Sequence, residues 1–341
     1  MSIVLDAMGS DKYPLPEIEA AIIAAGELNE EIILVGDEQL VGPKLKEANK
    51  NNARVRLVHA PDVLEMGDKA IESAQKKRNN SMAVGLQLVK SGEARAFVTA
   101  GNTGAALFVS ILTLGRIKGI SRPALTALFP VKNGGKCVVL DIGANVECRP
   151  DFLENFAIMG SVYAQKVLKI SSPRVALLSN GEEPGKGNNL VKETFPLLQK
   201  SGLNFIGNVE GKELFGGEAD VVVTDGFTGN VLLKSSEAVA KMITDTLKTE
   251  LKSSVFTQLG AALAMPALKK LKTLIDPEDI GAAPLLGIDG LSFVGHGRSN
   301  ALALVAALRT AHQACEADLM NSLRTAIQEK LALSEQNQPQ S

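Results

Sequence analysis

Tryptophan is absent from this chain of 341 residues, and tyrosine occurs only twice. Side chains that stack on nucleic-acid bases are therefore scarce. The net charge of −2 offers no general attraction to a phosphate backbone either. We expect no nucleic acid among the partners of this protein.

Cysteine is also scarce, and the three residues Cys137, Cys148 and Cys315 form no C-x-x-C pair. This pattern is typical of a reducing compartment and gives no zinc site. Cys148 follows a glycine loop but has no neighbouring histidine to lower its pKa, so we predict no covalent cysteine catalysis. No compact set of His, Asp and Glu ligands appears in the sequence, and we expect neither a metal nor a cofactor.

Long apolar runs are missing as well, because charge, proline or glycine interrupts each one within about 18 residues. The chain starts directly with a strand-like run, Ile3–Leu5, and shows no basic and then apolar leader. These features predict a cytoplasmic protein without a membrane-spanning helix.

What the chain does have is a regular alternation of short apolar runs with amphipathic stretches. The runs predict strands at Ile3–Leu5, Ile32–Val35, Val55–Val58, Ala96–Thr99, Leu125–Phe129, Val138–Asp141, Val175–Leu178, Asn204–Ile206, Val221–Thr224 and Leu291–Val294. Helices are expected between them, for example at Ile18–Glu27, Ser81–Lys90, Thr103–Arg116, Phe152–Val167 and Leu190–Lys200. This pattern is typical of an α/β fold with a doubly wound, mainly parallel sheet and helices on both faces.

The second half contains longer helical patterns. Residues 231–275 predict a helical hairpin that projects from the sheet, with breaks near Ser253-Ser254 and Met265-Pro266. A further long helix is expected over Asn300–Leu333, followed by a polar tail, residues 334–341, that we expect to be disordered. We interpret residues 1–333 as a single domain.

Four glycine-rich loops, each directly after a predicted strand, are the most informative motifs. A strand that runs through a glycine turn into a helix presents bare N–H groups at the positive end of a helix dipole, where phosphate binds. If all four lie at the carboxyl ends of parallel strands, they converge on one crevice. The loops are Gly101–Gly104, Gly143–Asn145, Asn180–Gly187 and Asp225–Asn230.

The third loop holds a lysine, Lys186, between Gly185 and Gly187. The loop, which also contains Asn180 and Gly181, resembles a P-loop. However, the spacing between Gly181 and Gly185 is too short, and Gly187 occupies the position of the Ser or Thr that would bind magnesium. Lys186 is either a solvated loop lysine or a charge that holds phosphate or a developing oxyanion, and the three sister loops favour the second interpretation.

The other loops supply polar groups that serve equally well as helix caps. Thr228 is a candidate N-cap in the fourth loop, and Asn102 or Thr103 in the first. Capping explains each loop alone, but the fourfold recurrence favours anion binding. The binding candidates in these loops are Asn102, Thr103, Gly104, Asn145, Asp225, Gly226, Thr228, Gly229 and Asn230.

A fifth strand-to-helix junction, Gly295–Asn300, contains His296 and Asn300. His296 is either a general acid/base or a histidine with satisfied hydrogen bonds. We interpret His59 and His312 as structural.

An amphipathic stretch covers Leu259–Ile275. Its apolar stripe packs against the body of the protein, against a second subunit, or against a membrane surface. The candidate membrane residues are Leu259, Leu263 and Leu271, with Lys269 and Lys272 on the other side.

Several of these segments together resemble one known family, the bacterial phosphate acyltransferases of phospholipid synthesis. Ser10 and Thr99 are small departures, at positions where the family usually has glycine and often has serine. The matching segments, in the family's order, are Asp6–Asp11, Ala100–Ala105, Leu140–Val146, Asn180–Gly187, Thr224–Val231 and Gly295–Asn300.

The resemblance implies a fold similar to that of isocitrate and isopropylmalate dehydrogenases, a homodimer, and peripheral association with the inner face of the cell membrane. It implies a reaction in which the acyl group of acyl-acyl-carrier-protein (acyl-ACP) passes to inorganic phosphate. The acyl phosphate would then serve a membrane glycerol-3-phosphate acyltransferase.

We expect bound phosphate to attack the thioester directly, with no covalent enzyme intermediate. Lys186 and Asn230 are the expected catalytic residues, and Asp225–Asn230 the main phosphate loop with help from Asn102–Gly104. The competing functions are a phosphotransacylase for short acyl-CoA, a metal-dependent dehydrogenase, and a non-enzymatic scaffold that binds ACP and membrane.

Overall fold

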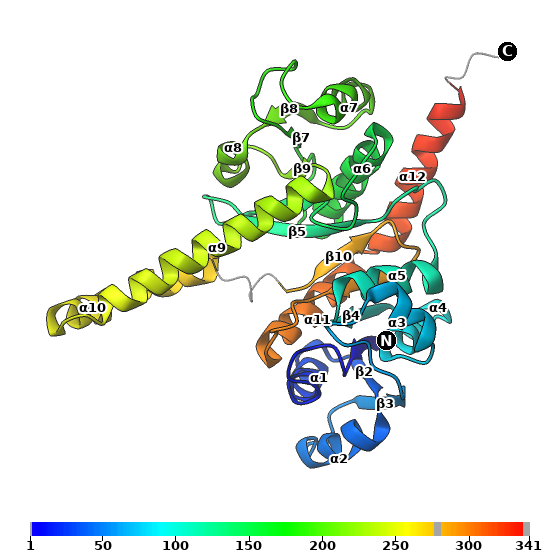
Figure 1. The fold of residues 1–341 in the computed structure, drawn as a ribbon, viewed down its shortest axis with the longest axis vertical. Helices are drawn as coiled ribbons and strands as arrows, with labels where there is room; N and C mark the ends of the chain where they lie inside the picture. The colour runs from blue at the N-terminus through cyan, green and yellow to red at the C-terminus, as the bar shows by residue number, and fades with distance from the viewer. Residues whose placement is uncertain (1, 276–280, 337–341) are drawn as a thin grey trace.

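The strands of this protein form one sheet that runs through the whole molecule. Figure 1 shows the computed structural model, which describes residues 2–275 and 281–336; the side chains of residues 270–275 and 334–336 fall outside that description. The strands are β1 (Ser2–Asp6), β2 (Glu31–Gly36), β3 (Val55–His59), β4 (Ala96–Thr99), β5 (Ala124–Pro130), β6 (Lys136–Leu140), β7 (Val175–Leu178), β8 (Phe205–Val209), β9 (Val221–Val223), β10 (Ala283–Leu286) and β11 (Leu291–Val294). Their order in the sheet is β3-β2-β1-β4-β11-β10-β5-β6-β9-β7-β8.

Helices cover both faces of this sheet, and each face has its own buried apolar cluster. The helices are α1 (Leu15–Leu28), α2 (Glu38–Ala48), α3 (Ala70–Lys76), α4 (Ser81–Lys90), α5 (Thr103–Leu114), α6 (Pro150–Lys166), α7 (Asn189–Lys200), α8 (Gly211–Gly216), α9 (Gly226–Leu251), α10 (Val255–Ile275), α11 (Ala301–Glu316) and α12 (Leu319–Gln336). α1, α6, α11 and α12 pack on one face, and α4, α5 and α8 on the other. The predicted fold class, a doubly wound and mainly parallel α/β sheet, is confirmed.

The direction of the strands reverses in the middle of the sheet. Strands β3, β2, β1, β4 and β11 are parallel to one another, and so are β6, β9, β7 and β8. Between the two groups, β10 and β5 make three successive antiparallel pairings. The two groups therefore run in opposite directions, and their carboxyl ends lie at opposite edges of the sheet.

This reversal corrects our expectation that four glycine loops converge at one edge. The loops that follow β6, β7 and β9 leave the sheet at one edge, whereas the loop after β4 leaves at the other. The sequence shows each strand and its loop but not the direction of the strand. The expectation fails because β10, a short strand containing Pro284, was not predicted.

Two helix boundaries also differ from the prediction. Residues 300–333 form two helices, because Asp318 between them adopts φ 48°, a left-handed conformation that a continuing helix does not pass through. α12 then extends to Gln336, so residues 334–336 of the expected tail are helical, and residues 337–341 lie outside the description. All strands belong to one sheet, as a single domain over 1–333 requires, although that division stays a prediction.

α9 and α10 form the expected helical hairpin, which projects from the body as Figure 1 shows. The chain turns at Lys252–Ser254, where a break was predicted, but α10 continues through Pro266, where another break was predicted and does not occur. Leu259 and Leu263 are 61% and 87% exposed, and Lys269 is exposed. The predicted membrane side chains Leu271 and Lys272 lie outside the description. Among the described helices, none is apolar over a length that would cross a bilayer.

A fully buried carboxyl group, Glu17, lies in the first turn of α1 beneath the β1–α1 loop. One of its oxygens accepts a hydrogen bond from the Ser10 N–H at 3.0 Å. Burial is the main reason that the pKa of Glu17 rises from 4.5 to about 7. Between these pH values the folded state keeps a proton that the unfolded state has lost, so stability falls as the pH rises.

We predict that Glu17→Gln stabilises the protein at pH 8 by about 3 kcal/mol and changes little at pH 4. Glutamine keeps the acceptor for the Ser10 N–H and cannot ionise. Urea unfolding of the variant at both pH values measures the difference. Glu19→Gln, an exposed position on the same helix, is the control. Equal effects at pH 4 and pH 8 would contradict the prediction.

Candidate active site

A cavity of about 670 Å³ lies over one face of β5, between α5 and α9. It reaches residues from both edges of the sheet: Gly143 and Ala144 follow β6 at one edge, and Gly295 and His296 follow β11 at the other. The start of α5 and the first turns of α9 complete its walls. The cavity therefore joins glycine loops that the sheet topology separates.

The floor of the cavity is apolar along the whole of β5. Leu125, Ala127 and Phe129 alternate along the strand, and Val131 follows directly after its end, so their side chains lie on the same face of the sheet. Beside them in the same sheet, β10 and β11 contribute Ala283, Leu285 and Val294, and α5 and α9 add Leu107 and Leu233. Sequence reasoning identified β5 only as a strand; the alternation was visible, but the helices that cover it were not.

Polar groups line the cavity at the helix starts and loops. Thr103 and Gly104 form the first turn of α5, His296 follows β11, and Asn230 lies at the end of the first turn of α9. Asn230 is exposed and faces Gly143: a Cβ placed on Gly143 would lie 3.8 Å from the Asn230 Cγ. Of the predicted site residues, the cavity brings together Thr103, Gly104, Asn230 and His296.

The loop after β6 is organised by Asp141, a fully buried carboxylate. Its Oδ1 accepts the N–H groups of Leu125, Gly143 and Ala144, and its Oδ2 accepts both the N–H and the side-chain amide of Asn145. Burial raises the pKa of Asp141, while these N–H donors oppose that shift. Donors alone surround the two oxygens in these bonds, which is the pattern that an ionised carboxylate requires.

Gly226 and Gly229 are needed where α9 packs against this loop. A Cβ on Gly226 would lie 2.5 Å from the Asn145 carbonyl oxygen, and one on Gly229 would overlap the Asp141 carbonyl oxygen. The Gly226 N–H donates to that Asn145 carbonyl at 2.8 Å. These glycines thus allow close contact between two loops of the protein, and a side chain at Gly229 would collide with backbone rather than with a ligand.

The cap of α9 is Asp225, not Thr228 as predicted. The Asp225 carboxylate accepts the Thr228 N–H and the Thr228 hydroxyl, both at 2.8 Å. The helix begins one turn earlier than expected, at Gly226. A carboxylate thus already occupies the positive end of this helix dipole.

The first glycine loop has a neutral cap instead. Asn102 accepts the Ala105 N–H at 3.0 Å, as one of our two alternatives predicted, and its amide donates to the Met66 carbonyl. No acidic residue lies in the first turn of α5. Behind the loop, the Thr99 hydroxyl accepts the Gly101 N–H and donates to the buried Asp6 at 2.7 Å. The exposed N-terminal turn at Thr103 and Gly104 is therefore held firmly against the cavity.

Two other predicted polar residues have structural roles in the described contacts. The Asn145 amide bridges Asp141 and the Pro123 carbonyl. Asn300 caps α11 by accepting the Ala303 N–H at 2.9 Å. Neither residue lines the cavity. Asn145 belongs to the loop whose Gly143 and Ala144 line it, and Asn300 caps the helix that follows Gly295 and His296.

The third glycine loop does not line the cavity. Its backbone closes on itself, because the Asn180 side chain accepts the Gly187 N–H, and its Glu182 pairs with Lys212 of α8 at 3.0 Å. Gly181 is buried beneath the stem of Lys186, and the lysine itself is exposed. Gly185 is open to solvent, with no atom near its Cβ position. The loop nevertheless emerges at the same sheet edge as Asp141 and Asp225, because β7 is parallel to β9 and β6.

The cysteines are poorly suited to act as nucleophiles. Burial raises the pKa of Cys137 and of Cys148 to about 12, and that of Cys315 to about 11. The thiolate, which is the reactive form, is therefore disfavoured at neutral pH.

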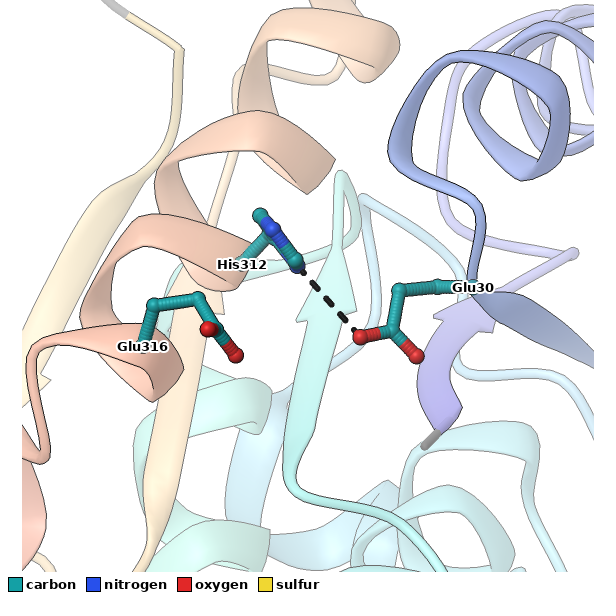
Figure 2. A group of neighbouring side chains, drawn as sticks. All are labelled: Glu30, His312 and Glu316. Atoms are coloured by element: carbon teal, nitrogen blue, oxygen red, sulfur yellow. Dashed lines mark ion pairs between the residues drawn. The ribbon is translucent and has the colours of Figure 1, made fainter.

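One cluster of possible metal ligands, which sequence reasoning missed, lies outside the cavity. Figure 2 shows Glu30, His312 and Glu316, which come from both ends of the chain. Arg95 pairs with Glu30 at 3.2 Å and with Glu316 at 2.9 Å, so a cation already balances the two carboxylates. We interpret the cluster as an ion-pair network that joins α11 to the β-strands, and we assign it no metal.

We predict that Lys186→Ala lowers kcat by about 10²–10³ without lowering Tm, because one donor to an oxyanion typically contributes that much. Lys186 is exposed, has a flexible four-carbon stem, and follows β7 at the same sheet edge as Asp141. Steady-state kinetics of the variant measure the effect. Lys200→Ala, which removes an exposed lysine from the adjacent α7, is the matched control. Equal kcat values for the two variants would leave Lys186 as a loop lysine.

Comparisons with known proteins show the family to which the chain belongs. The family model described as "Fatty acid synthesis protein" matches residues 1–322. A phosphate acyltransferase from Elusimicrobium minutum is 46% identical over 330 residues, which cover 96% of each chain. One from Pelotomaculum thermopropionicum is 44% identical over 328 residues, covering 96% of this chain and 95% of that protein.

Among solved structures, a phosphotransacetylase from Streptococcus pyogenes superposes with a TM-score of 0.60. It is 18% identical, and the match covers 93% of this chain and 94% of that one. At this identity the similarity concerns the fold alone.

Proposed function

Because this chain belongs to the fatty acid synthesis protein family and is a phosphate acyltransferase, we propose that it transfers a long-chain acyl group from acyl-ACP to inorganic phosphate. The products are acyl phosphate and free ACP. The acyl phosphate then serves a membrane glycerol-3-phosphate acyltransferase, which would be the next enzyme in phospholipid synthesis.

The observation that supports this proposal best is the cavity along β5. Polar groups lie at Asn230 and at the start of α5, and apolar side chains line the cavity between them at Leu125, Ala127, Phe129 and Val131. The distance from Leu125 to Val131 is about 20 Å at the usual rise per residue of a strand. An acetyl group would leave most of this apolar surface in water, so the cavity favours a long acyl chain over the short acyl-CoA alternative.

We propose that the phosphate binds mainly at the start of α5, which reverses the weight that sequence reasoning gave to Asp225–Asn230. The N–H groups of Thr103 and Gly104 lie at the positive end of a dipole that has a neutral cap. The start of α9 carries the Asp225 carboxylate, which would repel an anion. Asn230 then contributes its amide from across the cavity, and His296 a further donor or acceptor.

The chemistry needs little beyond positioning. A phosphate oxygen held beside the thioester carbonyl attacks it, and N–H donors or Lys186 stabilise the tetrahedral oxyanion. The leaving thiolate is a weak base, with a thiol pKa of about 8.5, so no strong general acid is required. Direct attack needs no covalent enzyme intermediate, in keeping with the high pKa values of the cysteines.

The proposed partners are ACP, a second copy of this chain, and the inner face of the cell membrane. ACP is acidic, so we expect it to dock on a basic surface near the cavity mouth. The membrane contact would be the tip of the α9–α10 hairpin, where Phe256, Leu259 and Leu263 are 86%, 61% and 87% exposed. Lys269 on the same helix suits an anionic bilayer. The same stripe would suit a dimer contact, which the experiment below separates.

We predict that the purified protein releases ACP from palmitoyl-ACP only when inorganic phosphate is present, and does so in EDTA. The cavity offers N–H donors rather than clustered carboxylates to the phosphate. Free ACP is measured by gel shift, and acyl phosphate by trapping with hydroxylamine. Sulfate in place of phosphate is the control and should give no acyl transfer. Release that stops in EDTA and returns with magnesium would refute this mechanism, and binding of ACP without turnover would support the scaffold alternative.

We predict that Leu259→Glu with Leu263→Glu abolishes binding to anionic liposomes while activity on soluble acyl-ACP persists. Each buried leucine contributes about 1.5–3 kcal/mol, so the pair shifts partitioning by more than tenfold. Co-sedimentation measures the binding. Gln258→Glu with Ala262→Glu adds the same charge to another side of α10 and serves as the control. If the first variant binds normally, the hairpin is not the anchor; if it dissociates into monomers, the stripe is a dimer contact.

A further inference from the structure

Two aromatic rings line the cavity at the carboxyl end of β5. Phe129 of β5 and Phe215 of α8 meet edge to face, with their centroids 5.8 Å apart and an interplanar angle of 64°. Phe129 is 3% exposed and Phe215 is 37% exposed, and both line the cavity. Phe129 lies four residues along β5 from Leu125, which is at the Asp141 end. The rings therefore lie at the end of the apolar floor away from Asp141.

The position of Phe215 is fixed by the local backbone. The Lys132 N–H donates to the Phe215 carbonyl at 2.9 Å, which ties α8 to the end of β5. α8 starts with a capping box between Glu210 and Glu213, and it ends at Gly217, whose φ of 82° favours glycine. A Cβ on Gly217 would lie 3.3 Å from Val131, so α8 is packed closely against the cavity floor. These backbone contacts therefore fix the position of Phe215 beside the cavity.

We propose that Phe215, packed on Phe129, ends the acyl-binding cavity and limits the length of acyl chain that this enzyme accepts. The inference rests on the proposed function, because it takes the long acyl chain of the donor as the occupant. The acyl carbonyl lies near Asn230 and Gly143, the chain runs over Leu125 and Ala127, and its methyl end meets Phe215. Ala127 is the smallest side chain on the floor and lies midway, so it keeps the path open.

The direction of the chain follows from polarity. At the Asp141 end of the floor, Asn230 is exposed and its side-chain amide suits the acyl carbonyl, whereas the N–H groups of Gly143 and Ala144 already donate to Asp141. Toward Phe215 the floor offers Ala127, Phe129 and Val131, which suit methylene groups. The start of α5 lies at this edge of the sheet too, but β11 and β10 separate it from β5. Lys132 at the outer rim has a long stem that would cover a protruding methyl end.

Two opposite substitutions test this inference. Phe215→Ala removes the wall, so kcat/KM for an 18-carbon chain should rise at least about tenfold relative to a 14-carbon chain, since one methylene in an apolar pocket is worth roughly that factor. Ala127→Phe blocks the middle of the floor and should shift the ratio by a similar factor toward 12-carbon and shorter chains. The ratios are measured by competition between acyl-ACPs of 12, 14, 16 and 18 carbons.

The control is Phe195→Ala. Phe195 makes a similar edge-to-face pair with Phe205, at 5.1 Å between centroids, and neither ring lines the cavity. Its chain-length ratios should equal those of the wild type. Phe215→Leu, which keeps an apolar side chain and only shortens the wall, replaces Phe215→Ala if the alanine variant fails to fold.

Unchanged ratios in a folded Phe215 variant, or equal losses at every chain length, would overturn the inference while leaving the proposed function intact. The proposed function fails separately if the wild type shows no phosphate-dependent release of ACP from any of these donors. If Phe215→Ala shifts the preference toward longer chains and Ala127→Phe shifts it toward shorter ones, the results support the proposal that the cavity floor limits the length of the acyl chain.

Discussion

The buried carboxylate of Asp141 connects most parts of the site. Its two oxygens take five N–H donors, from the start of β5 at Leu125 to the loop residues 143–145. Through the Asn145 carbonyl the same loop fixes the Gly226 N–H, and α9 begins there. A carboxylate removed from water requires such donors, because leaving it without them would cost several kcal/mol. The positions of β5, of the loop 143–145 and of the start of α9 around the cavity therefore depend on the Asp141 carboxylate.

The reversal of the sheet explains why a cavity exists at this place. In a uniformly parallel sheet, the glycine loops would crowd at one edge, and helices would cover the face between them. Here β10 and β5 lie between two oppositely directed groups, and α5 and α9 approach this middle region from opposite edges. The trough between them joins an anion-binding helix start to a long apolar strand. Phosphate and an acyl chain need these two environments side by side.

Much of the fold and of the site could be predicted from the sequence. The predictions that fail do so because they depend on contacts that no local pattern shows. The sequence predicts every described strand except β10, which contains Pro284, and it predicts the hairpin, because these signals are local. The sequence predicts the Asn102 cap as one of two alternatives but gives Asp225 as a ligand-binding residue, since capping and anion binding use the same residue types. The cavity along β5 was not predicted, because it depends on strand direction and on which helices lie over Ala127 and Phe129. Position 229 is an example. Glycine is required there because a side chain would collide with the Asp141 carbonyl oxygen, and no local sequence pattern reveals this contact.

The most direct test is a crystal structure of the protein with a long-chain alkyl phosphonate, a stable relative of acyl phosphate. We expect the phosphonate between Thr103–Gly104 and Asn230, with the alkyl chain over Ala127 and its end against Phe215. The N–H groups of α5 should donate to the phosphonate oxygens. An alkyl chain bound instead along the α9–α10 hairpin or between two copies of the protein, with the β5 cavity empty, would contradict this assignment of the active site.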